Sequence, residues 1–423
     1  MWTFVYHISY IECGVSQLPI NDSEKGVDVL EKKHKDLGLY IHIPFCVKKC
    51  DYCDFLSAPG TEVVKKQYVE ALLNEIHSYK GKVDDYLVPT IFIGGGTPSA
   101  IDPLLIEDIM KAVGDVFHID DTRLEATIEV NPGTLMKDKL MVYKRAGLNR
   151  ISFGLQSTDN IELKRLGRIH TYEQFKENYN LAREIGFNNI NIDLMSALPG
   201  QTLETWENTL SKVIDLGPEH ISAYSLIIEE GTPFHYLYGE DGKLRDMLPD
   251  EDMDRRIYHR TKELLKANGY NRYEISNYSR EGYECRHNIS YWIGSEYLGL
   301  GIGASSLFKG ARIKNIHDIN KYIERSSKDL DNQGLQDLIR EEYLELTISD
   351  KIEEFMFLGL RLTKGISIKE FEKRFQTSIY KAYNKEIKRL LDNNLIAIDG
   401  DILGLTDYGI DVSNAVLCEF IRN

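Results

Sequence analysis

Between residues 39 and 226, short apolar runs alternate with amphipathic helical patterns, and this rhythm leaves few folds open to the chain. Between the first two runs, for example, apolar residues recur at helical spacing over 68–79. Six such alternations predict parallel strands joined by right-handed crossovers, with helices covering the sheet. The runs expected as strands are 39–43, 90–93, 126–130, 150–153, 190–194 and 220–226.

The position of the polar and glycine residues distinguishes two arrangements of these strands. A doubly wound sheet and a barrel would both satisfy the alternation. In this chain, unusual polar and glycine residues come directly after the strands, as they do on the catalytic face of barrel enzymes. Because six units are present rather than eight, we expect an α/β fold with a partial (β/α)6 TIM-like barrel over residues 38–230.

The rest of the chain divides into three further parts. Residues 231–345 begin irregularly and are rich in Tyr, Gly and Asn, so we expect an irregular extension of the barrel. Residues 346–423 carry three helical patterns and a hairpin signal around Asp399-Gly400, which together predict a small winged-helix-like domain. Residues 1–37 form an N-terminal extension for which the sequence indicates no role.

Charge and composition narrow the classes of function. Lys and Arg total 51 against 66 Asp and Glu, and the formal net charge of −15 argues against nucleic-acid binding. The winged-helix-like part is therefore expected to pack or to dock a partner rather than to bind DNA. No run approaches the roughly 18 apolar residues of a membrane span, and the first residues do not read as a signal peptide. We expect a cytoplasmic protein.

Three of the six cysteines, Cys46, Cys50 and Cys53, lie close together directly after the first expected strand. Without an export signal, such a group favours metal or redox chemistry over disulfides. Three thiolates on one loop can hold three irons of a 4Fe–4S cluster and leave the fourth iron open to a small chelating ligand. Structural zinc is the alternative, but it requires four ligands, and His42 is the candidate for the fourth.

The Cys46-x3-Cys50-x2-Cys53 loop after a first strand resembles the radical S-adenosylmethionine (SAM) superfamily. In that superfamily the open iron chelates SAM, and an electron from the cluster cleaves its C–S bond to give a 5′-deoxyadenosyl radical. Five further segments resemble the branch that contains oxygen-independent coproporphyrinogen III oxidase, in the same order along the chain. They are 39–46, 94–98, 129–133, 154–157 and 193–195.

By this resemblance, particular residues near the ends of the strands would bind SAM. They are Tyr40, Gly95 and Glu129 for a first molecule, and Gly96, Thr97, Gln156, Arg168 and Asp193 where the oxidase holds a second. Tyr52, within the cysteine loop, is a further cofactor-binding candidate. The alternatives are a tight turn for the glycines, a helix cap for either carboxylate and a solvated helix charge for the arginine. No catalytic residue is assigned.

Two departures from the oxidase pattern bear on the substrate. The oxidase has a further cysteine two residues after the third ligand, whereas this chain has Phe55. Conversely, His287-Asn288-x-x-Tyr291-Trp292 matches the HNxxYW signature of the HemW haem chaperones. By that resemblance, His287 would be an axial ligand of haem. From the residues alone, the preferred interpretation of His287 is a hydrogen-bonded histidine in an aromatic corner of the core.

The resemblance to HemW implies a haem chaperone with three cofactors: a 4Fe–4S cluster, SAM and haem. Its partners would be haem, apo-haemoproteins such as those of the respiratory chain, and an electron donor, with no nucleic acid. Peripheral association with membrane proteins and a homodimer are both left open. The alternative function is oxygen-independent decarboxylation of coproporphyrinogen III, and a radical enzyme with another substrate is a third. Phe55 and the HNxxYW residues favour the chaperone.

Overall fold

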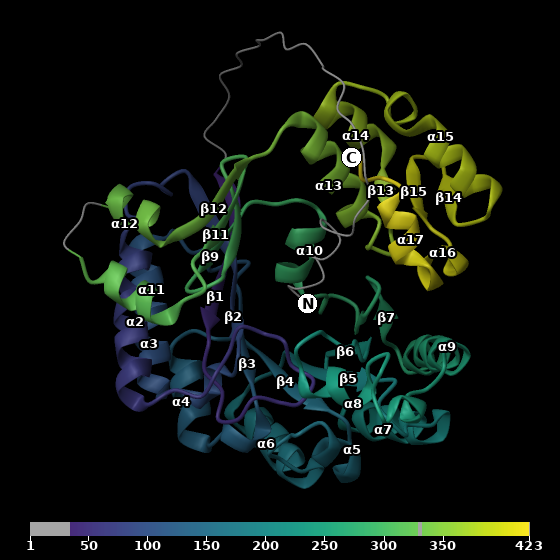
Figure 1. Cartoon of the computed structure of the whole chain (residues 1–423). Coiled ribbons are helices and arrows are strands. Elements are labelled where there is room, and N and C mark those ends of the chain that lie inside the picture. The colour runs from purple at the N-terminus through teal and green to yellow at the C-terminus, as the bar shows by residue number, and fades with distance from the viewer. Residues whose placement is uncertain (1–33, 329–331, 423) are drawn as a thin grey trace. The chain divides into compact units, whose positions relative to one another are not determined.

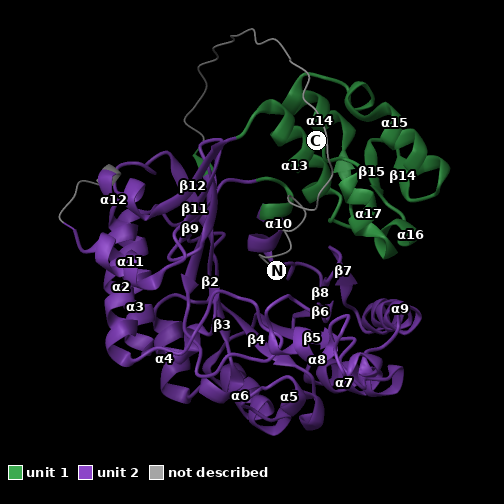
Figure 2. Ribbon diagram, in the orientation of Figure 1, with its two compact units in different colours: residues 1–35, 291–294, 346–423 green, residues 36–290, 295–345 purple. Residues whose placement is uncertain are grey.

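The computed structural model of the chain describes residues 34–328 and 332–422 (Figure 1). The N-terminal extension expected over residues 1–37 therefore falls almost entirely outside the described residues. The chain divides into two compact units, which Figure 2 colours separately. The larger unit comprises residues 36–290 and 295–345, and the smaller contains 291–294 and 346–423.

Six strands in sequence order form the centre of the larger unit, and helices cover their outer face (Figure 1). Strands β2 to β6 pair in parallel, and β1 lies beside β2. These strands confirm the predicted partial barrel. The strands are β1 (Lys35–Ile43), β2 (Tyr86–Gly95), β3 (Glu125–Val130), β4 (Arg150–Gln156), β5 (Ile190–Ser196) and β6 (His220–Ser225). The connecting helices are α2 (Glu62–His77), α3 (Pro103–Val116), α4 (Lys137–Arg145), α5 (Asn160–Arg165), α6 (Tyr172–Ile185) and α7 (Leu203–Leu216).

The two faces of this sheet differ sharply in polarity. In β3, for example, Ala126 and Ile128 are fully buried in the core shared with the helices. Glu125, Thr127 and Glu129 alternate with them and therefore point to the other face, the interior of the barrel. The apolar face stabilises the fold by burial against the helices, while the polar face is free to build a site.

The extension continues the same sheet on both sides of the barrel strands. One side adds β9 parallel to β1, followed by the antiparallel β10, β11 and β12, while β8 and β7 lie beyond β6. The added strands are β7 (Asn271–Arg272), β8 (Asn277–Ser279), β9 (Tyr297–Leu300), β10 (Ser305–Phe308), β11 (Ala311–Asn315) and β12 (Arg340–Glu345). The helices are α8 (Pro233–Tyr238), α9 (Glu251–Ala267), α10 (Arg286–Trp292), α11 (Ile319–Ser326) and α12 (Asn332–Ile339). The sequence indicated only irregular structure at the start of this region.

The smaller unit has the three helices and hairpin that the sequence predicted. Ser367 caps its second helix by accepting a hydrogen bond from the backbone of Glu370, and Gly400 turns the hairpin with a φ of 57°. Its elements are α13 (Ile348–Gly359), β13 (Ile366–Ser367), α14 (Ile368–Phe375), α15 (Ile379–Asp392), β14 (Ile396–Asp399), β15 (Ile402–Leu405), α16 (Asp407–Asp411) and α17 (Ser413–Cys418). Across both units, no described helix is long and apolar enough to cross a membrane.

Candidate functional site

The cysteine loop directly follows β1 and is tied to three neighbouring segments by backbone hydrogen bonds. The N–H of Cys46 donates to the carbonyl of Ala58 at 3.1 Å, which closes the loop at its base. The N–H of Asp51 donates to Leu166 at 3.2 Å, and its carbonyl accepts from Phe234 at 3.0 Å. The loop is thus held between its own base, the turn after α5 and the start of α8.

Two side chains donate hydrogen bonds to the thiols of this loop. The Thr97 hydroxyl lies 3.6 Å from Cys46 Sγ, and Arg168 Nη1 lies 3.5 Å from Cys50 Sγ. Burial raises the pKa of the Cys53 thiol to about 11, so iron must displace its proton on binding. The donors and the shared loop suit negatively charged cysteine sulfurs, as in an iron–sulfur cluster.

An iron–sulfur cluster and a single metal ion require different arrangements of their protein ligands. Within residues 34–328 and 332–422, no three His, Cys, Asp or Glu side chains converge on one metal ion. In a 4Fe–4S cluster each thiolate binds its own iron, so the thiols need only share a loop. His42 does not complete a zinc site, because its ring nitrogens contact the Tyr40 hydroxyl at 3.0 Å and the Leu56 carbonyl at 2.9 Å.

The glycine loop after β2 lies against the base of the cysteine loop. The N–H of Gly96 donates to the carbonyl of Ile43 at 2.9 Å, and the N–H of Thr97 donates to Phe45 at 2.8 Å. A Cβ on Gly95 would lie 2.6 Å from the His42 ring, and Gly95 also has a φ of 114°. A Cβ on Gly96 would lie 3.0 Å from Cys46 Sγ. These glycines therefore serve close packing beside the cysteines, beyond the needs of a turn.

Glu129, next to the glycine loop, completes the first group of candidate SAM residues. Its carboxylate accepts the N–H of Gly95 at 3.1 Å. Burial, and then repulsion from Asp193, raise the pKa of Glu129 to about 7. Burial and the Glu129 charge also raise the pKa of the Tyr40 phenol. The structure thus brings Tyr40, Gly95 and Glu129 together at the ends of β1, β2 and β3.

Gln156, Arg168 and Asp193 form a second group beside the first. A Cβ on Gly154 would lie within 3.4 Å of both the Arg168 guanidinium and the Gln156 amide, which shows how closely the two side chains approach. Tyr224 donates to Gln156 Oε1 at 2.9 Å. Tyr52 packs edge-on against Phe234, with ring centroids 6.2 Å apart. Burial raises the pKa of its phenol despite the opposing charge of Arg168.

Several of these contacts were not expected from the sequence. Asp193 accepts hydrogen bonds from the Ser152 hydroxyl at 2.9 Å and from the Asn191 amide at 2.8 Å. Together with Tyr224, these residues fix the polar side chains at the strand ends. Their signal in the sequence is a polar residue at every second position of a strand whose other residues are apolar. Strands buried on both faces in parallel sheets are normally near-continuous apolar runs.

His287 is separated from Tyr40 of the first group by Phe92, whose ring also stacks on that of Tyr40 with centroids 6.3 Å apart. His287 is 1% exposed, its Nδ1 lies 2.9 Å from the Thr90 hydroxyl, and its ring stacks on Phe92 with centroids 5.3 Å apart. Its N–H donates to Glu125, the first residue of β3, at 3.1 Å. The backbone of His287 therefore lies at the amino end of β3 and its ring reaches the middle of β2, whereas the cysteines follow the carboxyl end of β1. Burial, and then the Arg150 charge, lower the pKa of His287 to about 3.

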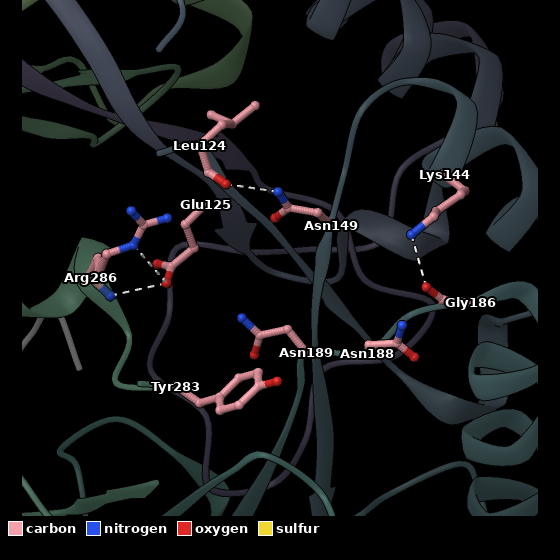
Figure 3. Close-up of a pocket in the computed structure, with 9 residues that line it drawn as sticks. All are labelled: Leu124, Glu125, Lys144, Asn149, Gly186, Asn188, Asn189, Tyr283 and Arg286. Carbon is pink, nitrogen blue, oxygen red and sulfur yellow. Dashed lines mark hydrogen bonds and ion pairs between the residues drawn. The ribbon is translucent and has the colours of Figure 1, made fainter. Parts of the chain in front are cut away.

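A polar pocket of about 330 Å³ lies beside this end of the barrel (Figure 3). Glu125, Asn149 and Asn189 line it from the starts of β3, β4 and β5, and Arg286 lines it from the start of α10. Glu125 accepts the N–H of Arg286 at 3.1 Å. The pocket therefore neighbours the HNxxYW helix and is separate from the cysteine loop.

Comparison with known proteins places the chain in a family. The Radical SAM superfamily model matches residues 40–213, and the HemN C-terminal domain model matches residues 346–412. "Heme chaperone HemW" of Lactococcus lactis is 37% identical over 92% of this chain and 98% of its own. The chain belongs to the HemW family. HemW of Bacillus subtilis is 35% identical over 90% of this chain, and HemW of Escherichia coli is 39% identical over 79%.

A solved structure supports the fold independently. Coproporphyrinogen III oxidase (HemN) from Escherichia coli superposes with a TM-score of 0.78 and covers 91% of this chain and 90% of its own. At 24% identity this likeness shows the fold alone. The resemblance to the radical SAM branch, to HemW and to a partial barrel is thus confirmed. Phe55, which stands where the oxidase pattern has a cysteine, is 40% exposed in this member of the HemW family.

Proposed function

We propose that this chain is a haem chaperone, which binds haem and delivers it to apo-haemoproteins. The observation that carries the proposal is the similarity to HemW heme chaperones over about nine tenths of the chain. Phe55 and the HNxxYW residues support it against the oxidase, because both depart from the oxidase pattern in the direction of HemW. In this proposal the chain acts in the cytoplasm and transfers haem to acceptors such as respiratory-chain proteins. It also docks at membrane proteins and forms a homodimer.

The cofactors follow from the two groups of residues at the strand ends. Cys46, Cys50 and Cys53 would hold the 4Fe–4S cluster, which supplies a single electron for cleavage of SAM when reduced by an electron donor. Gly95 and Gly96 keep backbone close to the cysteine loop, where a side chain would collide. The residues that would bind SAM are Tyr40, Tyr52, Gly95, Gly96, Thr97, Glu129, Gln156, Arg168 and Asp193.

The charge states of these residues favour a zwitterionic ligand such as SAM. The Arg168 guanidinium offers a cation for a carboxylate, and Asp193 offers an anion for an amino or ribose group. Glu129, with its pKa raised to about 7 by burial, can donate or accept a hydrogen bond near neutral pH. The polar residues at the strand ends thus supply both signs of charge.

The haem site requires a further step, because the ring of His287 is buried in the barrel and already contacts Thr90 and Phe92. Ligation of haem iron by His287 requires its ring to leave the Thr90 hydroxyl and the Phe92 ring. Such a movement would also strain the two backbone bonds from α10 to Glu125. Haem binding through His287 should therefore increase hydrogen exchange in α10.

The experiment is a haem titration of anaerobically reconstituted protein, followed by transfer to an apo-haemoprotein. We expect saturable haem binding, transfer to the acceptor, and weaker binding by His287→Ala with its iron–sulfur absorbance intact. The control is His317→Ala, since His317 is 45% exposed at its side chain and pairs with Glu341 far from the cysteines in sequence. Unchanged affinity in His287→Ala removes this residue from the haem site. Absence of saturable haem binding in the unmodified protein refutes the chaperone proposal.

A further inference from the structure

Arg168 is held against the cysteine loop by the turn that follows α5. The carbonyl of Leu166 accepts the N–H of Asp51 at 3.2 Å, which joins this turn to the loop. Gly167 has a φ of 74°, and a Cβ there would lie 2.9 Å from the Asp51 carboxylate. Arg168 is the next residue, so the close contact between Gly167 and Asp51 sets its position.

The guanidinium of Arg168 makes two directed contacts from this position. Nη1 lies 3.5 Å from Cys50 Sγ, and Nη2 donates to the Gly154 carbonyl. One arm is thus anchored on β4 while the other points to the sulfur. Arg168 is half-buried, so bulk water screens its charge less than that of a surface arginine.

Of the two side chains shown to donate to these sulfurs, Arg168 is the one that carries a charge, although the Lys49 charge also acts on the Cys53 thiol. Thr97 donates to Cys46 Sγ, but its hydroxyl is neutral. Lys48 and Lys49 belong to the loop itself, yet both are exposed, and the Lys49 ammonium donates to the Phe55 carbonyl at 3.0 Å. Arg168 therefore differs from Lys48 and Lys49 in giving a cysteine sulfur a directed, charged hydrogen bond.

Hydrogen bonds to cluster sulfurs and nearby charge are among the factors that set the reduction potential of an iron–sulfur cluster. One-electron reduction makes the cluster more negative, so a nearby cation stabilises the reduced state more than the oxidised state. A charge-assisted hydrogen bond to sulfur acts in the same direction.

We propose that the Arg168–Cys50 hydrogen bond raises the reduction potential of the cluster held by Cys46, Cys50 and Cys53. The electron comes from an external one-electron donor, and no covalent bond forms or breaks when the cluster accepts it. Arg168 thereby makes the cluster reducible by weaker donors than it would otherwise require. This role rests on the cluster of the proposed function and is independent of haem binding.

The test is a redox titration of the reconstituted full chain without SAM, followed by electron paramagnetic resonance. Arg168→Gln removes the charge, and we expect its midpoint potential to shift downward. Arg168→Lys keeps the charge without the planar fork and should shift less. Thr97→Val removes the neutral donor and should also shift less than Arg168→Gln. Arg165→Gln is the matched control, because Arg165 lies in the same segment but donates to the Pro199 carbonyl. The midpoint potential of the cluster in this variant should be unchanged.

A second readout keeps the proposal testable if the glutamine variant fails to take up a cluster. The Fe–S(Cys) stretching bands in the resonance Raman spectrum should then shift between the unmodified protein and Arg168→Lys. Equal potentials for the unmodified protein and Arg168→Gln would overturn the proposal. If the glutamine variant takes up no cluster, equal potentials and equal Raman bands for the unmodified protein and Arg168→Lys would overturn it. A chain that takes up no cluster at all would refute the cofactor assignment, and a chain that takes up a cluster but no haem would refute only the chaperone function.

Discussion

Substitution of Gly96 tests whether close packing of the glycine loop holds the cysteine loop in position. A Cβ at this position would lie 2.8 Å from the Phe45 carbonyl oxygen, 2.9 Å from Ser57 Cβ and 3.0 Å from Cys46 Sγ. Ordinary contacts are about 3.5 to 4.0 Å, so the Gly96→Ala substitution must displace backbone and the cysteine together.

The surrounding backbone resists this displacement. Hydrogen bonds from Gly96 to Ile43 and from Thr97 to Phe45 hold the glycine loop on the chain that leads into the cysteines. Overpacking of this kind costs about 1–3 kcal/mol. We therefore expect Gly96→Ala to lower the free energy of unfolding of the larger unit by that amount and to reduce cluster uptake, because Cys46 is pushed from its place.

The measurement is a urea titration of the cluster-free chain, paired with iron and sulfide analysis after anaerobic reconstitution. The matched control is Gly114→Ala in α3, where a Cβ meets nothing within 4 Å. Alanine is favoured over glycine in a helix by about 0.5–1 kcal/mol, so this control should be stabilised and take up a full cluster. If Gly96→Ala unfolds at the wild-type midpoint and binds a full cluster, the packing argument is wrong.

Three further predictions follow from the same structure. Cys50→Ala should abolish the iron–sulfur absorbance while Cys418→Ala leaves it intact, and a full spectrum in the Cys50 variant would defeat the ligand assignment. Burial and Asp193 raise the pKa of Glu129 from 4.5 to about 7. The stability that protonated Glu129 contributes is therefore present below pH 4.5 and lost as pH rises through about 7. Urea titrations over this range should show the free energy of unfolding decline, and Glu129→Gln should reduce the decline. Leu403→Ala removes a fully buried side chain from the smaller unit and should cost about 2–5 kcal/mol of unfolding free energy, whereas an unchanged urea midpoint would contradict its burial.

The barrel strands could be predicted because each is a local pattern. Every expected run from 39–43 to 220–226 lies in or overlaps a strand of the structure. The strands added by the extension were not found. β9 joins the sheet through β1, which lies far from it in sequence, whereas β10 and β11 form a local hairpin that was not predicted from the sequence. Gly299 lies in β9 opposite Tyr40 of β1, and this non-local pairing places it in the sheet. Such pairing leaves little trace in a glycine-rich stretch.

Sequence motifs named candidate site residues, but they could not show most of the contacts that these residues make. Motif matches named the side chains at the strand ends, and local spacing fixed the cysteine loop. Neither could show that Arg168 donates to Cys50 or that Tyr224 holds Gln156, because these pairs are 118 and 68 residues apart in sequence. The position of His287 depends in the same way on Thr90, which is 197 residues away.

The central claim is that this chain carries haem rather than decarboxylates coproporphyrinogen III. Anaerobically reconstituted protein can be divided into two parallel incubations. One receives coproporphyrinogen III, SAM and a reductant, and the other receives haem and is followed by absorbance. We predict saturable haem binding and no decarboxylated product. Protoporphyrinogen formation over many turnovers would contradict the account and show that Phe55 does not exclude the oxidase reaction.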